Sequence, residues 1–190
     1  MINPLMNYNC DPSKIDYMIN KIINLDRYDY PETDSKGHKR WFNSEGKLHR
    51  DNGPAIIWCN GAGSYYQNGK CHRDNGPAVI RRDGTLFYYQ DDELHREDGP
   101  AVIWTDGRVE YYQHDLLHRE DGPAIIRGDG SKEYYIKGKL HRENGPAVID
   151  SNGYIAYYIN DKCIGSYGLY LYKIIKKTKN FVMNKRRFVK

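Results

Sequence analysis

Histidine and arginine stand side by side at five places in this chain, and acidic residues follow each pair. The pairs recur at intervals of 23 residues. Imidazole and carboxylate groups together can bind a metal ion or transfer protons, so each pair is a candidate site for chemistry. The five histidines are His49, His72, His95, His118 and His141, and the five arginines are Arg50, Arg73, Arg96, Arg119 and Arg142.

The regular spacing argues against a shared metal or a catalytic site. If each period supplies two strands, equivalent histidines lie about 10 Å apart, because adjacent strands are about 4.8 Å apart. Zinc ligands lie about 2.1 Å from the metal, so histidines of neighbouring periods do not share one ion. A folding rule is obeyed in every copy, whereas catalysis needs one constellation. We therefore expect structural roles, and predict no catalytic residue, no metal and no cofactor.

The sequence of the loop suggests what those structural roles are. Arg96 and its copies can pair with the acids at the next two positions or with an adjacent period. The histidine can donate to a carbonyl and hold the turn closed. Gly99 and Pro100 complete the turn, because glycine adopts conformations that other residues avoid and proline fixes its own φ.

Short β-strands are the elements that must position this loop. Asp83-Gly84 and its counterparts separate runs of β-branched and aromatic residues, which predicts hairpins with type I′ turns. The chain turns again at the opposite end of each hairpin, as at Gly69-Lys70. Each period therefore predicts about two strands, and the whole array predicts roughly ten to twelve strands in an antiparallel meander. The fold class is mainly β.

Two consecutive tyrosines occur at one offset in every full period. Adjacent residues of a strand point to opposite faces, so each period places one ring on each face of the sheet. Binding energy at protein interfaces concentrates on aromatic residues, and tyrosine tolerates partial exposure. The first candidate column for partner contacts is Tyr66, Tyr89, Tyr112, Tyr135 and Tyr158, and the alternative column is Tyr65, Tyr88, Tyr111, Tyr134 and Tyr157.

The repeats divide the chain into three regions. Residues 1–36 do not repeat, and apolar residues at helical spacing predict a helix at about 13–26 that caps the array or docks a partner. Residues 37–165 hold five to six hairpin repeats. Residues 166–190 form a C-terminal strand or tail with eight Lys or Arg and no acid. Because the whole chain has a formal net charge of +4, the first 165 residues carry −4.

The basic tail can bind an anionic membrane or nucleic acid, or it is simply a solvated terminus. Its candidate anion-binding residues are Lys176, Lys177, Lys179, Lys185, Arg186 and Arg187. The chain has no run of about 20 apolar residues and no secretory pattern at its N-terminus. Its four cysteines form no Cys-x-x-Cys pair, which is typical of a reducing compartment. We expect a cytoplasmic protein.

The frame Tyr-Tyr-x-x-Gly-Lys-x-His, followed by Gly-Pro-Ala and Asp-Gly, resembles the MORN repeat and more closely its MORN-2-like variant. The resemblance covers roughly two-thirds of the chain. It departs where the family has His-Gly, because this chain has a longer charged loop. The form Leu-His-Arg-Glu-Asp-Gly-Pro-Ala is similar to arrays in large DNA viruses and bacteriophages. The resemblance implies stacked hairpins, an interaction or scaffold role, often with membrane attachment, and no catalytic residues.

Three functions follow from these observations. The favoured hypothesis is a non-enzymatic module, of viral type and placed in the host-cell cytoplasm, that binds a protein partner through a tyrosine-rich face. The second is a peripheral module that binds a membrane or nucleic acid through the basic tail. The third is a viral inhibitor of host defence, acting as a protein blocker or as a sponge for a small anionic ligand between repeats. An oligomer is compatible with each.

Overall fold

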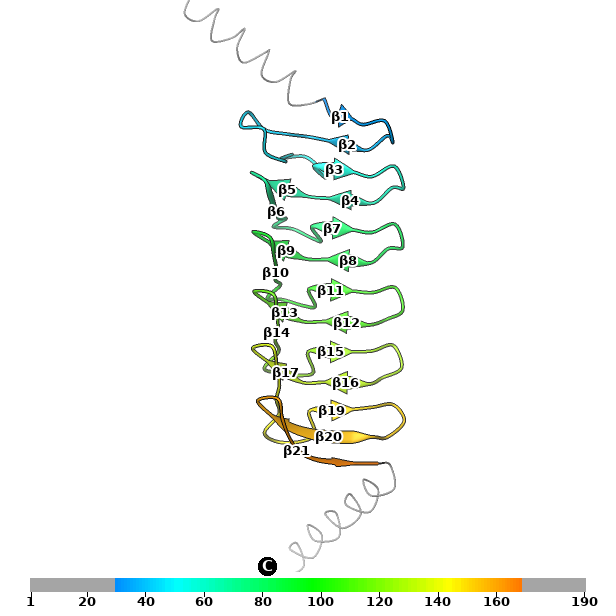
Figure 1. Ribbon diagram of the computed structural model, residues 1–190, viewed down its shortest axis with the longest axis vertical. Helices are drawn as coiled ribbons and strands as arrows, with labels where there is room; N and C mark the ends of the chain where they lie inside the picture. Colours follow the sequence, from blue (N-terminus) through cyan, green and yellow to red (C-terminus); the bar gives the residue numbers. More distant parts are fainter. Residues whose placement is uncertain (1–29, 169–190) are drawn as a thin grey trace, which may run out of the picture.

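The computed structural model describes residues 30–168 of the chain. All regular structure in this range is β, and Figure 1 shows an elongated stack whose strands cross its long axis. The predicted mainly β class and the antiparallel hairpins are therefore confirmed for these residues. The helix predicted at 13–26 and the six candidate anion-binding residues of the tail lie outside the described residues.

One antiparallel sheet of 13 strands runs the length of the stack, in the order β1-β2-β3-β4-β7-β8-β11-β12-β15-β16-β19-β20-β21. Its first eleven strands have two residues each: β1 (Glu32–Thr33), β2 (Lys39–Arg40), β3 (Ile56–Ile57), β4 (Gly63–Ser64), β7 (Val79–Ile80), β8 (Leu86–Phe87), β11 (Val102–Ile103), β12 (Val109–Glu110), β15 (Ile125–Ile126), β16 (Lys132–Glu133) and β19 (Val148–Ile149). The last two strands, β20 (Ile155–Ile159) and β21 (Lys162–Tyr167), are longer.

Four separate two-stranded hairpins lie beside this sheet. They pair β5 (Tyr66–Gln67) with β6 (Lys70–Cys71), β9 (Tyr89–Gln90) with β10 (Glu93–Leu94), β13 (Tyr112–Gln113) with β14 (Leu116–Leu117), and β17 (Tyr135–Ile136) with β18 (Lys139–Leu140). The described residues thus form 21 strands, more than the ten to twelve predicted. The number differs because, in four repeats, the strand with the tyrosine pair is split at its first tyrosine, where the chain passes from the main sheet into a side hairpin, and because a further short strand such as β10 precedes the His-Arg pair.

Two kinds of turn alternate along the chain, and their assignment corrects a prediction. At the turn after β7, the Gly84 amide donates to the Arg81 carbonyl at 3.0 Å, and Gly84 has φ 90° whereas Asp83 stays outside the positive-φ region. This is a three-residue loop ending in a left-handed glycine, so the type I′ prediction was wrong here. Asp83 Oδ1 accepts the Thr85 amide at 2.9 Å, and this local bond holds the turn.

The type I′ geometry occurs instead at the tips of the side hairpins. Asp91 and Asp92 between β9 and β10 have φ 50° and 74°, and His114 and Asp115 between β13 and β14 have φ 49° and 61°. Positive φ at both central residues matches the twist of a two-residue hairpin.

The core of the described region is thin. Val102 pairs with Phe87 on one side and Glu110 on the other, so the three side chains share one face of the main sheet. An alanine after the Gly-Pro of every loop has no exposed surface: Ala55, Ala78, Ala101, Ala124 and Ala147. The largest fully buried side chains in residues 30–168 are those of Val102 and Thr85. Stability therefore depends on contacts repeated between neighbouring units.

Candidate functional site

The His-Arg loops connect each side hairpin to the next strand of the main sheet. Residues 118–123 show how the loop is anchored. The His118 amide donates to the Tyr111 carbonyl at 3.0 Å, and the Tyr111 amide donates to the Ala124 carbonyl at 2.8 Å. Both ends of the loop are thus bound to one tyrosine, and the loop closes around it. Equivalent loops span 49–54, 72–77, 95–100 and 141–146, and we call the five together the loop ladder.

Each arginine of the loop ladder lies over the aromatic ring that its own loop encloses. The Arg119 Cζ atom is 4.0 Å from the centroid of the Tyr111 ring, and Arg119 Nη1 donates to the Pro123 carbonyl at 3.5 Å. The other four stacks have distances of 3.8–4.0 Å: Arg50 over Trp41, Arg73 over Tyr65, Arg96 over Tyr88 and Arg142 over Tyr134. A cation over an aromatic face contributes about 0.5–1 kcal/mol at such sites.

The predicted ion pairs of the arginines occur in two loops. Arg96 Nε lies 2.8 Å from Asp98 Oδ1, and Arg119 Nε lies 2.7 Å from Asp121 Oδ1. The stacking on aromatic rings was not predicted. It also explains the glycine of the loop, because a Cβ atom at position 122 would lie 3.0 Å from Arg119 Cζ. Glycine leaves the space in which the guanidinium lies.

Each histidine of the loop ladder links its own repeat to the next one. The Nδ1 atom of His118 accepts the backbone amide of Lys137, at the tip of the following hairpin, at 3.0 Å. The same bond recurs at 3.0–3.4 Å from Asn68 to His49, Asp91 to His72, His114 to His95 and Asn160 to His141. Since a backbone amide only donates, Nδ1 carries no proton. In place of the predicted bond from histidine to a carbonyl, each histidine accepts a backbone amide at Nδ1.

The acid two residues after each histidine is strongly exposed. The side chains of Asp51, Asp74, Glu97, Glu120 and Glu143 are exposed to 85%, 68%, 87%, 84% and 77%. The two aspartates lie 3.0 Å from Nε2 of their histidine, whereas the three glutamates lie at 3.8–4.0 Å. The loop ladder thus turns its carboxylates to solvent and keeps its guanidinium groups against aromatic rings.

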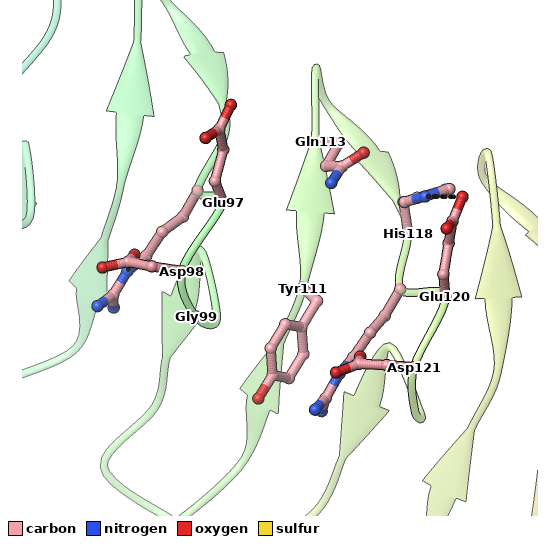
Figure 2. Close-up of a pocket in the computed structure, with 10 residues that line it drawn as sticks. Glu97, Asp98, Gly99, Tyr111, Gln113, His118, Glu120 and Asp121 are labelled. Carbon is pink, nitrogen blue, oxygen red and sulfur yellow. Dashed lines mark hydrogen bonds and ion pairs between the residues drawn. The ribbon is translucent and has the colours of Figure 1, made fainter.

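Neighbouring loops enclose equivalent grooves. One groove of about 490 Å³ lies between loops 95–100 and 118–123, and Figure 2 shows Glu97 and Asp98 on one side of Tyr111 with Glu120 and Asp121 on the other. A second groove of about 480 Å³ is lined by residues 23 positions further on, with Tyr134 in place of Tyr111. Gln113 lines the first groove and Ile136 the second. The grooves therefore repeat with the period of the sequence.

The two tyrosine columns have different surroundings, and both are half-buried. The alternative column supplies the rings of the grooves, Tyr111 and Tyr134. In the column that was the first candidate, the Tyr112 hydroxyl donates to Glu110 Oε2 at 3.0 Å and the Tyr135 hydroxyl donates to Glu133 Oε2 at 2.9 Å. These two hydroxyl groups are bound within the protein.

Burial raises the pKa of both tyrosines. For Tyr112 the desolvation of the phenolate and the nearby Glu110 carboxylate raise the pKa to about 12. For Tyr135 desolvation comes first, the hydrogen bond to Glu133 second, and the pKa again rises to about 12. A phenolate next to a carboxylate is unfavourable, so both side chains stay protonated as donors.

A polar cluster on the main sheet was missed from the sequence. Glu110 is only 4% exposed, and its Oε1 atom lies 2.9 Å from Trp104 Nε1 and 2.6 Å from Arg108 Nε. Arg81 lies over the Phe87 ring at 4.5 Å, next to this cluster. The position within the repeat could have predicted that Glu110 is buried. Other repeats have Ser64, Phe87 or Ala156 at this position, and these side chains face the interior.

Among residues 30–168, no three His, Cys, Asp or Glu side chains gather closely enough to hold a metal ion. The same part of the chain holds no helix that is long and apolar enough to cross a membrane. No protein-family model matches the chain, and no curated protein matches it.

Proposed function

We propose that this chain is a non-catalytic, MORN-like repeat module that binds a protein partner along its loop ladder. The supporting observation is the recurrence of one groove at two places a single repeat apart, with tyrosine, arginine and acidic residues at matching positions. A partner that crosses several repeats meets the same contacts in each. Such repetition adds many weak contacts into one binding surface, which is how extended faces of repeat proteins act.

The internal contacts of the loop favour binding over catalysis. The His118 imidazole accepts an amide at Nδ1 and faces Glu120 from Nε2 at 3.8 Å, while the Arg119 guanidinium lies over Tyr111. The imidazole is already engaged in linking two repeats, and the guanidinium in holding its own loop. The carboxylates are exposed and the tyrosine of the groove is half-buried, and these groups can form contacts without a reaction.

The proposal moves the partner contacts from the first candidate column to the alternative one. Tyr111 and Tyr134 line grooves, whereas the hydroxyl groups of Tyr112 and Tyr135 are bound to Glu110 and Glu133. The proposed binding surface still includes a column of tyrosines, and the charged residues of that surface belong to the loops.

A displayed library of random 15-residue peptides, selected on the full chain, tests this function. Filling two grooves with Gln113→Trp and Ile136→Trp should remove at least nine-tenths of the captured peptides, because both side chains line the grooves. Both positions belong to side-hairpin strands in which aromatic residues fit well.

The matched control is Arg82→Trp with Thr105→Trp, which adds two tryptophans to exposed residues of the three-residue turns. This variant should retain the captured peptides. If the groove-filled variant and the control bind the same peptides equally, or if selection yields none, the proposed function is wrong.

A further inference from the structure

The spacing of the loop ladder matches a particular peptide conformation. Successive loops are separated by two strands of the main sheet, which corresponds to about 9.6 Å. A polyproline II helix rises about 3.1 Å per residue with three residues per turn, so every third side chain lies on one face at intervals of about 9.3 Å. A β-strand lacks this match, because residues three apart point to opposite sides.

The charge of the grooves selects for cations. The groove around Tyr111 is lined by Glu97, Asp98, Glu120 and Asp121, against two arginines. Both guanidinium groups are stacked on tyrosine rings and paired with Asp98 or Asp121. The net negative charge of the groove therefore comes from the carboxylates of Glu97 and Glu120, which are more than four-fifths exposed and have only a histidine Nε2 atom at 3.8–4.0 Å. A lysine or arginine side chain that enters this groove is flanked by carboxylates from two loops.

The aromatic ring of each groove suits the rest of such a peptide. Tyr111 and Tyr134 line the grooves beside the loops, and Pro123 lines the second groove. Aliphatic stems of lysine and the rings of proline pack well on tyrosine, and polyproline II ligands of other modules bind to aromatic grooves in this way.

We propose that the loop ladder binds an extended polyproline II segment of a partner protein that carries lysine or arginine at every third position, with one cation in each groove. This inference rests on the proposed function and specifies the partner. The partner runs along the stack, and its cations follow the period of the repeats.

Two synthetic peptides test the register directly. The first contains five copies of Ser-Pro-Lys. The second has the same composition and length, but successive lysines are spaced alternately two and four positions apart. Fluorescence anisotropy with the full chain, at two salt concentrations, measures both affinities. We expect the first peptide to bind at least tenfold more tightly, because only its lysines share one face of the helix.

Charge variants of the chain test the surface. Glu97→Gln, Glu120→Gln and Glu143→Gln together should weaken binding of the first peptide at least tenfold, because each removes an exposed carboxylate of the ladder. The matched control removes three acids from the three-residue turns of the main sheet: Asp83→Asn, Asp106→Asn and Asp129→Asn. Asn60 and Asn152 stand at that position in other repeats, so these turns stay intact. The control should bind like the native chain.

The outcomes separate this inference from the proposed function. Equal binding of the two peptides, or no binding of either, overturns the inference. If the library still yields peptides that the groove-filled variant does not bind, and these lack a basic residue at every third position, the function stands without it. Loss of affinity in the control variant as large as in the Glu→Gln variant would also overturn it, since binding would then follow net charge alone.

Discussion

The fifth loop and the C-terminal hairpin occupy equivalent positions of the repeat but fold differently, because the His-Arg pair and the Gly-Pro are present only in the fifth loop. In residues 141–146, His141 and Arg142 precede a Gly-Pro, the strands around them have two residues each, and a side hairpin forms. One period later Ile164 and Gly165 stand at those positions, and no Gly-Pro follows. There β20 and β21 pair continuously over five and six residues, with a bulge between Tyr157 and Tyr158.

This difference shows that the loop, and not the tyrosine strand, divides each repeat into two parts. Tyr134 and Tyr157 occupy the same position, yet Tyr134 lies under the Arg142 guanidinium at 3.8 Å and Tyr157 packs edge-on against Tyr167 at 6.0 Å. When the loop is present, its two ends form hydrogen bonds with the backbone amide and carbonyl of the tyrosine. When it is absent, the tyrosine stays in the sheet and the array ends.

The largest expected effect comes from giving the fifth loop the sequence of the C-terminal hairpin. His141→Ile with Arg142→Gly removes the stack on Tyr134, the bond to the Pro146 carbonyl and the bond from the Asn160 amide. At roughly 1 kcal/mol for each contact, the free energy of unfolding should fall by about 3 kcal/mol, as measured by urea denaturation.

The reverse exchange, Ile164→His with Gly165→Arg, is the control for this variant. It should change the free energy of unfolding by less than about 0.5 kcal/mol, because both positions are in the surface hairpin and no Gly-Pro follows to build a loop. If both exchanges cost the same, the comparison of the two regions is wrong.

The next effect is a loss of stability in alkali. In the folded protein the pKa values of Tyr112 and Tyr135 rise to about 12, whereas an unfolded tyrosine titrates near pH 10. The unfolded chain therefore releases protons first, and stability that is complete below about pH 10 falls as the pH rises toward 12. Urea midpoints measured between pH 9 and 11.5 should decrease steadily.

Tyr112→Phe with Tyr135→Phe should make this decrease shallower, because the variant no longer carries the two phenols whose pKa is raised. Tyr154→Phe is the control, since Tyr154 is exposed near the C-terminal hairpin and should leave the pH dependence as it is. A double variant whose midpoints follow those of the native chain between pH 9 and 11.5 would contradict the prediction.

A smaller loss of stability should distinguish a glycine of the loop ladder, Gly122, from a glycine of the C-terminal hairpin, Gly165. In Gly122→Ala the new Cβ would meet Arg119 Cζ at 3.0 Å and displace the guanidinium from Tyr111, which should cost about 1 kcal/mol. In Gly165→Ala the nearest atom is the Tyr167 hydroxyl at 3.6 Å, an ordinary contact, so thermal unfolding should change little. Equal melting temperatures for the two variants would show that the close approach of Arg119 is unimportant.

The smallest effect concerns reactivity rather than stability. Cys71 and Cys163 occupy the same repeat position, but Cys71 is buried and desolvation raises its pKa to about 12, whereas Cys163 is exposed. Iodoacetamide at pH 8 should modify Cys163 quickly and leave Cys71 unmodified in the folded chain, as read by mass spectrometry of the digested protein. Modification of both at one rate would indicate that the following repeat does not cover Cys71.

The repeat pattern predicted much of the fold, because it reports local rules. Gly-Pro, Asp-Gly and the β-branched runs specify turns and strands from neighbouring residues alone, and the antiparallel array follows. The type I′ turn was assigned to the wrong end of the hairpin, since Asp83 accepts the Thr85 amide in a three-residue loop whereas Asp91 and Asp92 have the positive φ values. The grooves were not predicted, because each is formed by two loops 23 residues apart.

The sequence by itself determined the period, the β class and the special place of the His-Arg-acid-x-Gly-Pro loop, since these depend on contacts within one unit. Only the tertiary structure decided what the loop does. The Arg119 guanidinium stacks on the Tyr111 ring, and the His118 imidazole accepts a backbone amide from the next repeat. It also decided which tyrosine lines a groove, because that choice depends on where a loop folds back across the strand that precedes it.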